Sequence, residues 1–127
     1  ASSLAGVVAQ RLVRVLCPRC RKPYVMSRDA LLDLIPDFPM EEGESEVTLY
    51  HPYGCLSCNN TGFRGRCGIY EFLRVTEEIQ SLILTHASNH EIKTKAVEQG
   101  MTTLRGDGLL KVREGITSLE EMLRVII

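Results

Sequence analysis

The chain has 127 residues, of which 44% are hydrophobic and 24% are charged, and this composition is ordinary for a globular domain with one modest core. Fifteen Lys and Arg against sixteen Asp and Glu give a formal net charge of −1, which supplies no bulk attraction for nucleic acid. No apolar run approaches the roughly 20 residues that span a bilayer. The chain opens without an initiator methionine or a signal peptide, so we expect a segment of a longer protein.

The first predicted element is an amphipathic helix over residues 3–16 that stops before Pro18, because proline disfavours helical conformation in the residue before it. Its apolar residues recur at helical spacing: Leu4, Val7, Val8, Leu12, Val15 and Leu16. Ser27 is a suitable N-cap for a short helix over residues 28–35 that ends at Pro36. Residues 36–46 are acidic and lack periodicity, and we expect them to form a solvated, mobile loop.

Two short strands are predicted over residues 47–50 and 68–73, with a turn-rich, glycine-containing segment between them. The rest of the chain is predicted to be helical, with four short helices that each begin at a capping residue. These caps are Thr76, Ser88, Thr103 and Thr117. The fold class expected is therefore α+β, mainly α: a subdomain with short strands over residues 17–74, followed by a small helical bundle over residues 75–127.

Four of the five cysteines form two Cys-x-x-Cys pairs separated by 34 residues: Cys17, Cys20, Cys55 and Cys58. Two intervening residues allow both thiolates of a pair to reach one tetrahedral ion, and four thiolates close the coordination shell. A closed shell leaves no position for water, so the spacing predicts one structural Zn²⁺ rather than a catalytic one.

Two alternatives to zinc are open for these cysteines. Disulfides are disfavoured by the lack of a signal peptide, and a redox Cys-x-x-Cys needs a thioredoxin-like βαβ context that neither pair has. Cys67, nine residues after Cys58, is interpreted as a small apolar residue and not as a ligand.

The sequence shows no catalytic machinery. It has no Gly-x-x-x-x-Gly-Lys-Ser/Thr phosphate loop, so this chain alone is not expected to hold a nucleoside triphosphate in that manner. His51, His86 and His90 are far apart and lie in no recognisable metal or nucleophile motif. We therefore predict no catalytic residue and no enzyme activity for this chain acting alone.

The motifs together resemble the C-terminal region of bacterial type II secretion ATPases and of the related type IV pilus assembly ATPases. The resemblance runs in unbroken order over nearly the whole chain. It rests on residues 4–14 with Leu16-Cys-Pro-x-Cys20, on Gly54-Cys-x-x-Cys58 with Thr61-Gly-Phe-Arg-Gly-Arg66 and Gly68-Ile-Tyr-Glu71, and on the tail from Gly100 to Glu121. Cys67 and Gly106 depart from that pattern, and the loop over residues 36–46 matches no motif of the family.

The resemblance implies that residues 1–16 continue from a missing nucleotide-binding core, where ATP and Mg²⁺ bind. It implies an accessory and oligomerisation region of a cytoplasmic, hexameric ATPase, peripheral to the inner membrane, whose partners are its own neighbouring subunits and an inner-membrane platform. Arg64 and Arg66 are candidates for contact with a neighbouring subunit, its nucleotide site or an acidic partner; the alternative is that they compensate the thiolate charge. A free-standing zinc ribbon that binds nucleic acid or unfolded protein is the rival hypothesis, disfavoured by the near-neutral charge.

Overall fold

The computed structural model describes residues 5–126, which form a mixed α+β fold with five α-helices and four antiparallel strands. In chain order the elements are β1 (Gly6–Leu16), β2 (Lys22–Ser27), α1 (Arg28–Leu34), β3 (Glu46–His51), the 3₁₀ turn η1 (Leu56–Cys58), β4 (Phe63–Arg74), α2 (Glu77–Leu84), α3 (Asn89–Glu98), α4 (Leu104–Arg113) and α5 (Leu119–Val125). Among these described residues, no helix combines the length and the hydropathy that crossing a bilayer requires.

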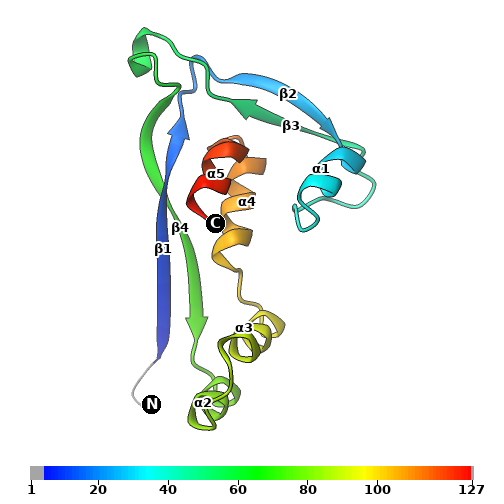
Figure 1. The fold of residues 1–127 in the computed structure, drawn as a ribbon, viewed down its shortest axis with the longest axis vertical. Helices are drawn as coiled ribbons and strands as arrows, with labels where there is room; N and C mark the ends of the chain where they lie inside the picture. The colour runs from blue at the N-terminus through cyan, green and yellow to red at the C-terminus, as the bar shows by residue number, and fades with distance from the viewer. Residues whose placement is uncertain (1–4, 127) are drawn as a thin grey trace.

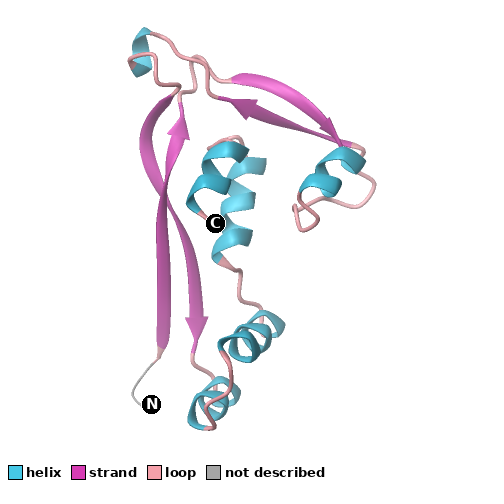
Figure 2. Cartoon of the chain, in the orientation of Figure 1, coloured by secondary structure: helices cyan, strands magenta, loops and turns pink. Residues whose placement is uncertain are grey.

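The strands form two separate two-stranded ribbons, β1 with β4 and β2 with β3. Figure 1 shows that the ribbons meet at an apex that carries η1, and that β2 and β3 extend from it as an arm ending in α1. Helices α4 and α5 lie in the angle between the ribbons, whereas α2 and α3 pair at the far end of the β1–β4 ribbon (Figures 1 and 2). The four C-terminal helices therefore fall into two pairs.

The helix predicted over residues 3–16 is wrong, because β1 occupies Gly6–Leu16; residues 3 and 4 lie outside the described part. The segment pairs with β4 in a register that runs from Gly6–Arg74 to Leu16–Phe63. Its many β-branched valines suit a pleated ribbon better than a helix. The apolar positions that match helical spacing do not form a buried stripe, because Leu16 is buried while Val7, Val8 and Leu12 are exposed. Val13, which is not one of these positions, is fully buried.

Four of the predicted helix starts are confirmed by side-chain caps, in which Ser27, Thr76, Ser88 and Thr103 each accept a hydrogen bond from a backbone N–H three residues on. The last helix begins one residue later than predicted. Ser118, not Thr117, caps α5 by accepting from the N–H of Glu121 at 3.1 Å. Thr117 does not cap the helix, because its hydroxyl donates to the carbonyl of Arg14 at 2.7 Å.

The main core lies between the arm and the α4–α5 pair. It consists of buried side chains from α1, β3, α4, α5 and the loop after α1: Leu31, Ile35, Phe38, Val47, Leu49, Leu109, Val112, Leu119 and Met122. The acidic loop is irregular and most of its residues are exposed, as expected, but two of its carboxylates are paired with arginines of α4. Arg113 pairs with Glu44 at 2.6 Å and Arg105 pairs with Asp37 at 2.7 Å, so two arginines of α4 attach the loop to the helix pair.

Candidate metal centre

The four cysteines of the two Cys-x-x-Cys pairs lie together at the apex, with all four sulfur atoms within 4.8 Å of one another. The Sγ atoms of Cys17 and Cys55 are 3.8 Å apart, those of Cys20 and Cys58 are 3.8 Å apart, and those of Cys55 and Cys58 are 3.7 Å apart. A zinc tetrathiolate with Zn–S bonds of about 2.3 Å has sulfur–sulfur edges of roughly 3.8 Å. These sulfur–sulfur distances therefore suit a tetrahedral site. None of the five cysteines forms a disulfide.

Backbone N–H groups of the second pair point at the sulfur atoms. Cys58 Sγ accepts from the N–H of Cys55 at 3.3 Å and from the N–H of Gly62 at 3.2 Å, and Cys20 Sγ accepts from the N–H of Gly54 at 3.3 Å. Hydrogen bonds of this kind stabilise thiolates and fix the orientation of metal ligands. The two pairs are thus prepared to act as one ligand set.

The thiols differ in acidity because of these contacts. Burial opposes ionisation of Cys58, but the hydrogen bonds from Cys55 and Gly62 outweigh it and lower its pKa to about 6. Burial and the neighbouring thiols raise the pKa of Cys20 to about 11. Four thiolates in so small a volume repel one another, and a divalent cation removes that repulsion.

Glycine is required at position 62, four residues after the second cysteine pair. Gly62 has φ of +84°, and a Cβ at this position would lie 2.6 Å from Pro52 Cβ and 3.0 Å from the backbone nitrogen of Tyr53. No side chain fits there without moving backbone atoms. This close approach returns the chain from η1 into β4 and lets the carbonyl of Gly62 accept from the N–H of Cys17 at 2.9 Å.

The first cysteine pair is joined directly to the turn between α4 and α5. The N–H of Leu16 donates to the carbonyl of Ile116 at 2.8 Å. Arg21 follows Cys20, and its guanidinium donates to the carbonyl of Gly115 at 2.7 Å while lying 3.9 Å from the centre of the Tyr50 ring. The cysteine cluster and the helix pair are therefore mechanically connected through the residues that flank Cys17 and Cys20.

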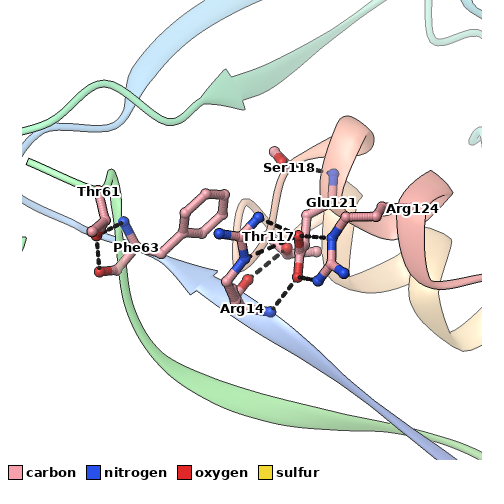
Figure 3. A network of polar contacts seen from close by, with 7 residues as sticks. All are labelled: Arg14, Thr61, Phe63, Thr117, Ser118, Glu121 and Arg124. Atoms are coloured by element: carbon pink, nitrogen blue, oxygen red, sulfur yellow. Dashed lines mark hydrogen bonds and ion pairs between the residues drawn. The ribbon is translucent and has the colours of Figure 1, made fainter.

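A second connection is the carboxylate of Glu121, whose side chain is fully buried between two arginines (Figure 3). Arg14 donates to it from its backbone N–H at 2.9 Å and from its guanidinium at 2.9 and 3.1 Å. Arg124 donates to it at 2.9 and 3.0 Å. This network could not be predicted from the sequence, because Arg14 and Glu121 are distant along the chain and neither belongs to a motif that predicts pairing.

Stability is expected to fall in acid, and Glu121 should account for part of the loss. Burial opposes its charge, but hydrogen bonds from Arg124 and Arg14 outweigh burial and lower its pKa to about 2, below the unfolded value of about 4.3. The stabilisation is therefore complete above about pH 5 and disappears as pH falls toward 2. Glu121→Gln should lower the free energy of unfolding at pH 7 by about 2 kcal/mol and flatten its decline between pH 5 and 3 in denaturant titrations.

The matched control is Glu120→Gln, which removes a neighbouring carboxylate that is exposed and that, within residues 5–126, forms an ion pair only with His51, at 3.2 Å. This variant should keep the wild-type pH profile. An unchanged profile in Glu121→Gln would show that the buried network contributes nothing to stability in acid.

The remaining candidate residues lie outside the cysteine cluster. Arg64 is exposed and donates to the Ser57 hydroxyl at 3.0 Å, next to η1. Arg66 is exposed on β4, opposite Arg14 of β1. Cys67 is half-buried on β4 and does not belong to the cluster. Of the histidines, His51 stacks on Tyr24 with ring centres 3.8 Å apart, while His86 and His90 are exposed.

The sequence matches the family model described as type II/IV secretion system protein over residues 1–124. The chain belongs to this family. It is 44% identical over 126 residues to the type II secretion system ATPase E of Vibrio cholerae, covering 98% of this chain and 24% of that protein. It is 40% identical over 126 residues to the type IV pilus assembly ATPase TfpB of Acinetobacter baylyi, covering 99% of this chain and 21% of that protein.

A third relative, the type IV pilus assembly ATPase PilB of Pseudomonas aeruginosa, is 42% identical over 125 residues, covering 98% of this chain and 21% of the relative. The chain thus spans about a fifth to a quarter of the length of the curated relatives it matches. The family resemblance predicted from the cysteine, glycine and tail motifs is confirmed.

Proposed function

We propose that this chain is a zinc-binding accessory and oligomerisation region of a hexameric secretion or pilus assembly ATPase. The observation that carries the proposal is the four-cysteine cluster at the junction of both ribbons and the α4–α5 pair, in a chain that aligns end to end with about a fifth to a quarter of ATPases of this family. The region has no phosphate loop, so nucleotide chemistry belongs to other parts of the longer protein.

Zinc is the metal that this ligand set favours. Four thiolates in a tetrahedron select Zn²⁺ over the oxygen-seeking cations, and the sulfur spacing of 3.7–3.8 Å suits its bond length. The ion would join two segments 34 residues apart and contribute free energy of folding rather than chemistry. Because the ligand shell is closed, the function of the metal is to keep the apex rigid.

The relatives' names divide between two transport systems. Type II secretion ATPase E is matched at 44% and the pilus ATPases TfpB and PilB at 40% and 42%, so identity gives only a slight preference. We favour a type II secretion parent, which would work at the cytoplasmic side of the inner membrane with membrane-embedded partners of its system. The alternative is a type IV pilus assembly parent, and complementation of a strain lacking either ATPase distinguishes the two.

The interface hypothesis for the exposed arginines is tested with Arg66→Ala in the full-length, zinc-loaded protein. If Arg66 contacts a neighbouring subunit, this variant should lower hexamer-dependent ATP hydrolysis several-fold at unchanged zinc content, because placing charge across subunits is what stimulates hydrolysis. If Arg66 instead only compensates the negative charge of the thiolates, the variant should hydrolyse ATP normally but retain zinc less tightly. Normal hydrolysis, normal assembly and normal transport would remove the interface role.

A further inference from the structure

Although the net charge of the chain is only −1, one end of the arm is basic and the other end is acidic. Residues 5–28 and 47–70 contain no Asp or Glu, whereas residues 29–46 contain seven and no Lys or Arg. The first group includes β1, the apex, β2, nearly all of β3 and the apical part of β4, whereas the second forms most of α1 and the loop that follows it (Figure 1). Arg28, the first residue of α1, belongs to the first group by sequence but donates to the carbonyls of Glu41 and Glu44 at the acidic end. The six-residue strand β2 separates the two ends by roughly 20 Å.

The basic end carries exposed cations that bind no carboxylate within the described chain. Arg19, Lys22, Arg64 and Arg66 are exposed, and within residues 5–126 none of them lies within 4.0 Å of an Asp or Glu oxygen. We call this surface, together with the turn η1, the basic tip. A zinc tetrathiolate adds a charge of −2 at the same place. The four cations outweigh it, so the tip remains positive.

Apolar side chains project from the same tip. Leu56, on η1 between Cys55 and Cys58, is 92% exposed, and Tyr53 is 66% exposed. Lys22 lies 4.1 Å from the centre of the Tyr53 ring, so an aromatic face and a cation are presented together. A leucine held in solvent on a rigid metal-bound turn has no structural benefit within the described chain, and its burial by a partner would be favourable.

The opposite end of the arm has matching chemistry. The outer surface of α1 and the acidic loop, which we call the acidic end, exposes Asp29, Asp33, Glu41, Glu42 and Glu46. The other two acids of this segment, Asp37 and Glu44, are already paired with α4. Leu34, the last residue of α1 and the sequence neighbour of Asp33, is 60% exposed. The acidic end thus presents an exposed apolar side chain on an element that also carries exposed carboxylates.

We propose that the basic tip of one copy docks on the acidic end of a second copy, with Leu56 packing near Leu34. The two surfaces are different, so the contact is head-to-tail, and a head-to-tail contact generates a ring when its rotation closes. This inference rests on the proposed subunit ring and names the acidic partner of Arg64 within it. Opposite charges would set the register and the rate of association, and the leucines would supply apolar burial.

The test is sedimentation equilibrium of the zinc-loaded chain at concentrations up to about 1 mM, compared at about 50 mM and 500 mM salt because screening weakens exposed charge pairs. Association is expected at low salt and should weaken at least about tenfold at high salt. Arg64→Glu and Glu42→Arg should each weaken it, and the double variant Arg64→Glu with Glu42→Arg should restore it, because the charges are then exchanged across the contact. Leu56→Ser should weaken it without a change in charge.

The matched control combines Arg64→Glu with Glu98→Arg, which has the same net charge as the double variant but alters α3, at the other end of the molecule from the arm (Figure 1). Zinc content and circular dichroism verify that each variant is folded. Equal restoration by the control would show an effect of net charge alone and would overturn the contact, as would a wild-type chain that remains monomeric at low salt. In either case zinc binding and ring formation by the longer protein would stand, since they are measured separately.

Discussion

Replacing Cys58 with serine is expected to abolish zinc binding and to lower the melting temperature of the chain by more than about 10 °C. Structural zinc contributes about 10–16 kcal/mol to the folding of small peptides that bind it, which is comparable to the whole stability of a domain. Cys58 is buried and accepts two backbone hydrogen bonds, so serine removes a ligand and loosens the second pair. Hydrogen exchange should rise at least over residues 17–66, measured by mass spectrometry.

The matched control is Cys67→Ser, which changes the one cysteine outside the cluster. Cys67 is half-buried on β4, and the variant should retain one equivalent of zinc with a loss of about 1 kcal/mol or less. Equal loss of zinc in both variants would mean that the ligand set is not the one the geometry indicates.

In the full-length protein, Cys17→Ser is expected to leave nucleotide affinity within a few-fold and to abolish secretion or pilus assembly. The nucleotide site lies outside this region in our proposal, whereas the cysteine cluster is bonded to the α4–α5 turn through Leu16 and Arg21. Without the ion the apex would no longer be rigid enough to transmit motion between subunits. Nucleotide binding is measured by fluorescence titration and transport by export of a secreted substrate or by pilus display.

A finer variant separates rigidity from metal content. Arg21→Ala preserves all four thiolates but removes the hydrogen bond to Gly115 and the contact with Tyr50, so transport should fall several-fold at full zinc occupancy. Arg11→Ala, at an exposed position of β1 outside the basic tip, is the control and should be close to wild type. Full transport by Arg21→Ala would show that coupling does not pass through this connection.

The grouping of the four cysteines could be predicted from sequence because each Cys-x-x-Cys turn brings its two sulfur atoms close together locally. The caps at Ser27, Thr76, Ser88 and Thr103 were predictable for the same reason, since each bonds a backbone N–H three residues away. The assignment of α+β is confirmed, and the family resemblance followed from these same motifs.

The misassigned elements depend on contacts between distant residues. The β1 segment satisfies helical spacing, but its pairing with β4 is a long-range interaction that periodicity does not reveal. Thr117 is a good capping residue, yet a hydrogen bond to Arg14 in β1 engages its hydroxyl and shifts the cap to Ser118. The acidic loop is largely exposed, as expected, but its attachment to α4 was not predicted, because the arginine partners Arg105 and Arg113 lie far along the chain.

The proposed function depends on a closed zinc tetrathiolate at the apex. The most direct measurement is metal analysis combined with zinc X-ray absorption on freshly purified, reduced chain. We predict one zinc per chain with four sulfur neighbours at about 2.3 Å and no oxygen or nitrogen ligand. Well under one equivalent of zinc, or a shell containing water or histidine nitrogen, would contradict the claim.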